Sequence, residues 1–456
     1  MVTVSARSTP NVVLLTVDAL RADLFVDDEG PSVPTPNIDG LSDEALRATN
    51  GYANAPHTRA AFPAILTGTY PWAHGGYETL GSERPSLAER MADGGYATGG
   101  FHSNPYLEAE FGYDSGFDRF VSNSESVSRL AAVRRRLTKA FSGDRKDTFL
   151  YRAIEQAHAL SSRVTGVDIG VPYLSGEALN ETVASWLEDT TEPLFLWAHY
   201  MDPHDPYLPR PDTVSQDIPR RRSIRLQKRL TSDPDAIDGD ERADLLRLYR
   251  GEVEYLDRCI GELLEVIRTE LGPTLVVLTA DHGEAFDEHG YYRHPDAFHE
   301  ELIRIPLLLT GPQVTPGRID GHMSAVDVMP TVLGLCDLDI PDGCHGSPVT
   351  SDEGRRRQVF AETGEPGEGR VMTVRDGWKL VTDADGSRPV LYDLRADPDE
   401  RDDLADERMD VVADLRSDIL EHVEAVTSTS DTGEEPSDVS DDVRDRLARL
   451  GYTKPR

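Results

Sequence analysis

The sequence predicts an α/β protein with a mostly parallel central sheet flanked by helices, followed by a small antiparallel sheet. Continuous apolar runs are typical of strands that are buried on both faces, as in parallel sheets. Three such runs cover residues 11–17, 193–198 and 274–280, and each is followed directly by Asp or His. Because ligands of open α/β sheets bind beyond the carboxyl ends of the strands, we expect the chemistry where these runs end.

Helical spacing of apolar residues separates these strands. It covers residues 86–94, 175–188 and 243–269, and Ser175 is a candidate N-cap. Strands that alternate with helices favour a mostly parallel sheet covered by helices. Residues 122–168 are rich in Arg, Ser and Ala, and we interpret them as an inserted helical region and a candidate lid.

The composition changes after about residue 352. Short strands are predicted at residues 371–374, 378–381 and 390–392, with turn residues between them. An acidic helix near 409–427 and a polar tail follow. We therefore predict a catalytic α/β domain over residues 1–352 and a small subdomain over residues 353–456.

The charge balance excludes one class of partner. The 456 residues carry 47 basic and 82 acidic side chains, a formal charge of −35. General nucleic-acid binding needs clustered Lys and Arg, so no nucleic-acid partner is expected. Scarce lysine and abundant carboxylates are expected of a halophilic protein working in concentrated salt, and an ordinary acidic mesophilic enzyme is the alternative.

The cysteines and the hydropathy favour a reducing interior. Cys259, Cys336 and Cys344 are too few for a disulfide framework, although the last two are close enough in sequence to pair. No run approaches the roughly 20 apolar residues of a membrane helix. The first ten residues are polar and lack a signal-peptide pattern. We expect a cytoplasmic location without stable membrane insertion.

A basic run over residues 220–229 stands out against this acidic background. It contains Arg220, Arg222, Arg225, Lys228 and Arg229. Two interpretations stay open at this point: a solvated helix face, or a surface that steers an anionic substrate.

Asp18, Asp281 and His282 follow two of the predicted buried strands. Their oxygen and nitrogen atoms suit a divalent cation such as Mg, Ca, Mn or Zn, with a coordination position left open for an anionic substrate. A single Asp after a strand is more often a helix cap or a turn residue. The joint occurrence of three such residues at strand ends favours a metal site.

Motifs that span most of the chain resemble those of one known family. They occur at residues 11–23, 35–41, 66–71, 74–75, 199–204, 281–284, 289–290, 300–306, 378–381 and 391–394. In this order they resemble the sulfatase family within the alkaline-phosphatase superfamily. The resemblance implies an alkaline-phosphatase-like fold and a hydrolytic site in which Asp18, Asp281 and His282 hold one metal ion.

The resemblance also implies the position of the nucleophile. Sulfatases proper use a formylglycine made from the first residue of a Cys/Ser-x-Pro-x-Arg motif. The family's spacing before Gly68 leads to Thr58, within His-Thr-Arg-Ala-Ala-Phe at residues 57–62. The Cys or Ser, the Pro and the Arg of the motif are all absent. We therefore expect no formylglycine, and expect Thr58 to be both nucleophile and metal ligand.

This difference changes the expected substrate. A formylglycine hydrate expels sulfate by collapse through its second hydroxyl, whereas threonine has only one hydroxyl. An ester on Thr58 has to be released by water attacking the central atom, as in phosphoryl transfer through a covalent intermediate. A small anionic phosphoester is the preferred substrate class, and a sulfate ester is the alternative.

Further roles follow from the resemblance. We expect Arg59 to stabilise the equatorial oxygens of the substrate, His204 to bind the ester or leaving-group oxygen, and His294 to act as general acid. Arg59 as a surface residue, His204 as a turn residue and His294 as a loop residue are the alternatives. Weaker candidates are His74, His102 and His289.

Two other functions compete with hydrolysis. A phosphoglycerol- or phosphoethanolamine-type transferase passes the group to an alcohol, but such relatives usually carry membrane helices. A non-catalytic binding scaffold is the other alternative, and the retained Asp18, Asp281 and His282 argue against it. Neither the leaving group nor the oligomeric state is predicted.

Overall fold

The computed structural model describes residues 9–25, 33–75, 79–80, 84–122, 173–350, 358–428 and 443. Its central sheet has nine strands in the order β11-β2-β10-β6-β1-β5-β3-β4, with β9 paired to β2. Their bounds are β1 Asn11–Val17, β2 Leu46–Tyr52, β3 Ala97–His102, β4 Arg119–Ser122, β5 Leu194–Tyr200, β6 Thr274–Ala280, β9 Arg304–Ile305, β10 Leu307–Thr310 and β11 Gly317–Ser324.

The middle of this sheet is parallel. Strands β6, β1, β5, β3 and β4 all run in one direction, and every residue of β1 and β5 is buried. Only β10 and the short β9 pair in the antiparallel sense, whereas β11 is parallel to β2. The predicted mostly parallel α/β sheet is confirmed.

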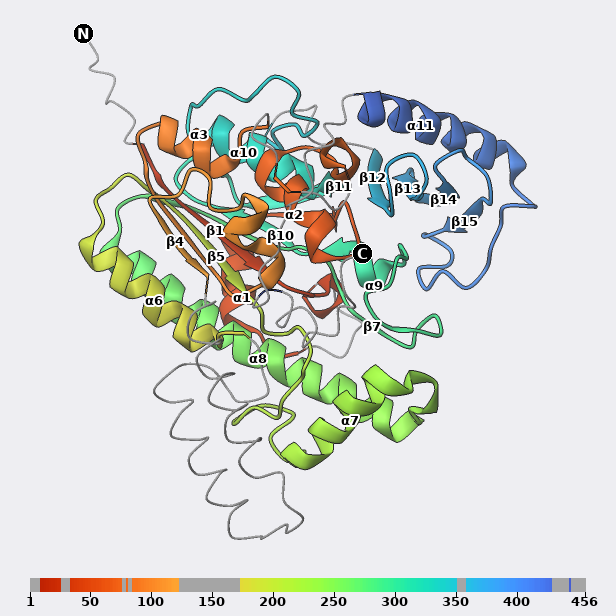
Figure 1. Ribbon diagram of the computed structural model, residues 1–456, viewed down its shortest axis with the longest axis horizontal. Helices are drawn as coiled ribbons and strands as arrows, with labels where there is room; N and C mark the ends of the chain where they lie inside the picture. The colour runs from red at the N-terminus through yellow and green to blue at the C-terminus, as the bar shows by residue number, and fades with distance from the viewer. Residues whose placement is uncertain are drawn as a thin grey trace.

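Helices cover both faces of the sheet. Figure 1 shows α6 and α8 side by side along one face, with α2, α3 and α10 grouped on the other. The helices predicted at 86–94, 175–188 and 243–269 correspond to α3, α6 and α8. The helix bounds are α1 Pro36–Asp43, α2 Thr58–Thr67, α3 Leu87–Asp93, α6 Gly176–Asp189, α7 Arg220–Ser232, α8 Gly239–Glu270, α9 Glu300–Ile303, α10 Val328–Leu335 and α11 Met409–Ser428.

Capping residues define where the helices begin. Ser86 and Glu89 form a reciprocal capping box at the start of α3, and Asp238 and Glu241 form another at the start of α8. Each box satisfies backbone N–H groups that have no partner within the helix. The Ser175 side chain caps α6 as predicted.

The carboxyl-terminal strands form a separate antiparallel sheet in the order β12-β13-β14-β15. Helix α11 packs on β13 and β14, to the right in Figure 1. The bounds are β12 Gln358–Thr363, β13 Arg370–Arg375, β14 Trp378–Asp383 and β15 Val390–Asp393. The predicted small antiparallel sheet is therefore present, and a short hairpin of β7 Ala285–Phe286 and β8 Tyr292–Arg293 lies before it in sequence.

Parts of the predicted organisation lie outside the described residues. These parts are the boundary between residues 352 and 353 and, beyond the end of β4, the inserted region.

Cys259, Cys336 and Cys344 are all free thiols. Among the described residues, no helix combines the length and the apolar character needed to cross a bilayer.

Candidate metal and nucleophile site

Two neighbouring parallel strands place the acidic residues together. Strands β1 and β6 are paired in register up to Val17 opposite Ala280, so the next residue of each strand lies at the same edge. The backbone N–H of Asp281 donates to the carbonyl of Val17 at 3.3 Å, which continues the pairing by one residue. Asp18 and Asp281 are both fully buried there.

The predicted metal ligands converge. His282 Nε2 lies 3.6 Å from Asp18 Oδ1 and 3.6 Å from Asp281 Oδ2. These two carboxylate oxygens are buried and have no hydrogen-bond donor among the described residues. Burying a carboxylate oxygen without a partner is costly, so a group of this kind usually holds a cation. The residues therefore fit a divalent ion.

The surrounding hydrogen bonds hold these side chains in place. Asp281 Oδ1 accepts from the backbone N–H groups of Ala19 at 3.2 Å and His282 at 2.9 Å. His282 Nδ1 lies 2.8 Å from the carbonyl of Gly283, which places its proton on that nitrogen. Nε2 is then left as the metal-binding atom, the usual arrangement in which an outer partner selects the tautomer.

Thr58 joins this group as the first residue of α2. Its Oγ1 lies 3.4 Å from Asp18 Oδ2 and 3.3 Å from His282 Nε2, and its side chain is buried. The amino-terminal end of a helix carries partial positive charge, which favours an anion held beside the hydroxyl. The four residues predicted as metal ligands are thus together in space.

The two carboxyl groups differ in their affinity for a proton. Burial raises the pKa of Asp18, but the neighbouring imidazoles of His204, His199 and His282 outweigh it and hold the pKa well below its usual range. Burial and the adjacent charge of Asp18 raise the pKa of Asp281. Two acids this close do not ionise equally unless a cation lies between them.

Two further residues contact Asp18 and were not predicted as site residues. Asn104 Nδ2 donates to Asp18 Oδ2 at 2.8 Å, and His199 Nε2 lies 3.6 Å from the same oxygen. His199 was visible in the sequence as the residue after the apolar run at 193–198. Asn104 follows β3, a glycine-containing strand without a continuous apolar run, so its position gave little signal.

His204 and His294 line the same site. The ring centroid of His294 lies 4.5 Å from that of His282 and 5.5 Å from that of His204. Burial lowers the pKa of His204, but Asp18, Asp205 and Glu284 outweigh it and raise the pKa. Burial and the charge of His282 lower the pKa of His294. The structure therefore places both predicted histidines beside the candidate metal ligands.

Arg59 is half-buried, and its guanidinium group lies near two aromatic rings. Its guanidinium carbon lies 6.0 Å from the ring centroid of Tyr106 and 5.7 Å from that of Phe111. Such an arrangement is a cation–π contact. Its role at the substrate oxygens stays a prediction.

Two of the weaker candidates, His74 and His102, are packed in the protein core. His74 Nε2 hydrogen-bonds to Thr67 at 3.0 Å and to Thr69 at 2.6 Å, and burial lowers its pKa to about 3. The ring of His102 stacks on Trp197 with centroids 5.7 Å apart. Both side chains are buried and contact neighbours from the core.

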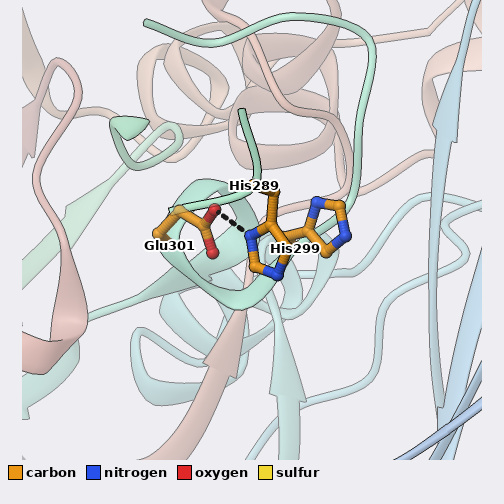
Figure 2. A group of neighbouring side chains, drawn as sticks. All are labelled: His289, His299 and Glu301. Carbon is orange, nitrogen blue, oxygen red and sulfur yellow. Dashed lines mark hydrogen bonds and ion pairs between the residues drawn. The ribbon is translucent and has the colours of Figure 1, made fainter. Parts of the chain in front are cut away.

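The third weaker candidate, His289, lies in a second group with His299 and Glu301, shown in Figure 2. His289 Nδ1 lies 2.8 Å from Glu301 Oε1, and its Nε2 lies 3.0 Å from the carbonyl of Asp399. The rings of His289 and His299 are stacked at 3.6 Å with planes only 4° apart. Because lone pairs lie in the ring planes, two parallel imidazoles do not converge on one ion. This group is a hydrogen-bonded contact with the loop before residue 400.

The residues of this buried group, Asp18, Thr58, Asp281 and His282, all lie within one stretch of sequence that matches a known family. The family model described as Sulfatase matches residues 10–338. The chain therefore belongs to the sulfatase family and is an ester hydrolase.

Relatives with known names cover most of the chain. It is 25% identical over 442 residues to the choline-sulfatase of Rhizobium meliloti, covering 87% of this chain and 82% of the relative. It is also 25% identical over 439 residues to arylsulfatase K of Xenopus laevis, covering 87% and 79%.

Solved structures show the same fold. The phosphonate monoester hydrolase of Agrobacterium radiobacter superposes with a TM-score of 0.66 at 19% identity, over 92% of this chain and 96% of that one. A protein in complex with its substrate D-glucosamine-2-N,6-O-disulfate superposes with a TM-score of 0.67 at 17% identity, over 94% and 99%.

Proposed function

We propose that this protein is a metal-dependent hydrolase that cleaves phosphoesters with Thr58 as its nucleophile. The observation that carries the proposal is the position of the Thr58 hydroxyl, 3.4 Å from Asp18 and 3.3 Å from His282. A sulfate ester remains the alternative substrate, supported by the named sulfatases among the relatives.

Asp18, Asp281 and His282 would hold one divalent ion, together with the Thr58 hydroxyl. When bound, the ion lowers the pKa of that hydroxyl and neutralises charge on the anionic ester. Asn104 donates to Asp18 Oδ2 and so keeps this carboxylate oriented toward the other candidate metal ligands.

In the first step, Thr58 Oγ1 forms a bond to phosphorus as the bond to the leaving-group oxygen breaks. The proton of Oγ1 has one acceptor in reach that the metal ion does not need, Asp18 Oδ2 at 3.4 Å. The departing oxygen takes a proton from a nearby histidine. His294 is our candidate general acid, and His204 binds that oxygen.

In the second step, water attacks phosphorus and the bond to Thr58 Oγ1 breaks. Threonine has no second hydroxyl through which the product could be expelled, so release depends on attack at the central atom. This chemistry favours a phosphoester. An alcohol in place of water would make the protein a transferase.

The test is hydrolysis of aryl phosphate monoester, phosphodiester and sulfate substrates with added Mn, Mg, Ca or Zn. We expect metal-dependent phosphoester cleavage that is lost in Thr58→Ala and partly kept in Thr58→Ser, which retains a hydroxyl. Sulfate cleavage that survives Thr58→Ala would show that the nucleophile is a different group. Tight metal binding without turnover would favour the binding scaffold.

We also propose that the enzyme works in a cytoplasm of concentrated salt. The formal charge of −35 supports this, because salt screens repulsion among surface carboxylates. Activity and thermal stability measured across KCl concentrations test it. Both should rise with salt, and a fall of both would support an ordinary acidic enzyme.

A further inference from the structure

Within the part of the chain that the structure describes, helix α7 is strongly basic although the protein is acidic. Its 13 residues, Arg220–Ser232, include five arginines and one lysine, in a chain whose formal charge is −35. The hydrolytic mechanism above makes no use of them.

One face of α7 packs onto the protein. Ser223, Leu226 and Leu230 are buried, and Ser223 Oγ donates to the carbonyl of Tyr207 at 2.6 Å. Toward α8, Arg222 pairs with Asp244, and Arg229 Nη1 pairs with Glu241 at 2.5 Å. These contacts account for two of the six cations.

The opposite face is exposed and positively charged. Arg221, Arg225 and Lys228 lie at positions i, i+4 and i+7, which form one stripe on a helix. They make no ion pair or hydrogen bond with any residue that the structure describes, and Ile224 beside them is 53% exposed. At 1.5 Å rise per residue the stripe is about 10 Å long.

The helix is joined to the catalytic site by hydrogen bonds. Arg293 Nη2 donates to Thr231 Oγ1 of α7 at 2.9 Å and to Asp205 Oδ2 at 2.8 Å, and Asp205 follows His204 in the chain. Figure 1 shows α7 beside the first turns of α8.

A second connection runs through the loop that precedes α7. Tyr207 receives the Ser223 hydrogen bond at its carbonyl and donates its own hydroxyl to Glu284 Oε2 at 2.8 Å. Glu284 in turn lies 3.4 Å from His294 Nδ1. Hydrogen bonds therefore connect helix α7 with the segments that carry both predicted leaving-group histidines.

We propose that the exposed face of α7, formed by Arg221, Ile224, Arg225 and Lys228, is an accessory binding site for a polyanionic substrate. The substrate class is a polymer that carries several sulfate or phosphate groups besides the ester being cleaved. The inference rests on the proposed function, because it assumes that an anionic ester enters the site. The chain has a formal charge of −35, so a cationic stripe on its surface needs an explanation. Direct contacts of Arg and Lys with sulfate or phosphate groups act at short range and are screened by salt less than long-range repulsion is.

The test measures binding of fluorescein-labelled dextran sulfate by fluorescence anisotropy over a series of KCl concentrations in which the protein is folded. The variant is Arg221→Gln/Arg225→Gln/Lys228→Gln. The matched control, Arg119→Gln/Arg268→Gln/Arg395→Gln, removes the same number of exposed cations elsewhere. Three surface charge contacts lead us to expect an affinity loss of about ten-fold in the α7 variant and less than about two-fold in the control.

A second readout separates this inference from the proposed function. Dextran sulfate should inhibit phosphoester turnover by the wild type, and the inhibition should weaken in the α7 variant. If the wild type turns over no ester but α7-dependent binding persists, the proposed function fails and the polyanion site stands without a substrate role. Equal losses in both variants would overturn the inference. Binding of α7 to phosphatidylserine vesicles, without binding to dextran sulfate, would replace it with a membrane surface.

Discussion

Two groups of three histidine and carboxylate side chains in this molecule lie within metal-ligand distance of one another. They differ in how far their polar atoms are already hydrogen-bonded. At the ends of β1 and β6, Asp18 and Asp281 each keep a buried oxygen without a donor, and His282 directs Nε2 toward both. In the other group, both ring nitrogens of His289 face acceptors, one of them Glu301.

This difference shows what identifies a metal site in a protein of this kind. In both groups, nitrogen and oxygen atoms that could bind a metal lie close to one another. Unsatisfied buried oxygens and converging lone pairs are present only in the first. The second group has its hydrogen bonds made, so an ion would have to displace them.

The largest expected difference is in catalysis. Asp281→Asn should lower kcat/KM for an aryl phosphate at least about a hundred-fold, because a metal ligand is lost. Glu301→Gln, the matched change in the second group, should lower it less than about three-fold. Steady-state kinetics with saturating metal measure both. Comparable losses would mean that the second group also acts in catalysis.

The next difference concerns the leaving group. His294→Gln should lower the rate about a hundred-fold for an alkyl phosphoester, whose leaving oxygen needs a proton, and much less for a nitrophenyl ester. His204→Gln should weaken binding of both esters. His299→Gln, in the second group, is the control and should change neither. A loss in His294→Gln that is the same for both esters would exclude general acid catalysis by this residue.

We expect the first group to bind one metal ion and the His289 group to bind none. Titration of metal-free protein with Mn or Zn, followed by calorimetry, should show one ion per chain. Asp281→Asn should abolish this binding, and His299→Gln should leave it unchanged. A second ion that disappears in His299→Gln would contradict our account of the His289 group.

The smallest expected effect is on stability without metal. The pKa of Asp281 is raised by burial and by Asp18, so its stabilising contribution is present below the unfolded-state pKa and lost as pH rises through the folded-state pKa. At pH 7, Asp281→Asn should therefore raise the Tm of the EDTA-treated protein by a few degrees. The gain should disappear in acid, where the wild-type carboxyl is protonated. An unchanged or lower Tm at pH 7 would show that the buried charge is already compensated.

The sequence allowed the first group to be predicted because it depends on strand order and register. Apolar runs ending in Asp18 and Asp281 have to meet once β1 and β6 pair in parallel. Thr58 came from motif spacing, and the structure places it beside Asp18. The mostly parallel sheet and the small antiparallel sheet followed from hydropathy and turn residues.

Other features could not be predicted because they depend on contacts between distant segments. Asn104 reaches Asp18 from 86 residues away, after a strand without a strong apolar run. The stacking of His289 on His299 depends on side-chain rotation, which residue types do not specify. The antiparallel insertion of β10 between β6 and β2 depends on how its short apolar segment folds back.

Attack of Thr58 on the substrate leaves a covalent intermediate, which mass spectrometry of acid-quenched enzyme can detect. The enzyme is mixed with an aryl phosphate and metal, quenched in acid during turnover and digested. We predict a phosphoryl group on the peptide that contains Thr58, and its absence from the corresponding peptide of Thr58→Ala. Sustained turnover with an unmodified Thr58 peptide, or with the adduct on another residue, would show that Thr58 is not the nucleophile.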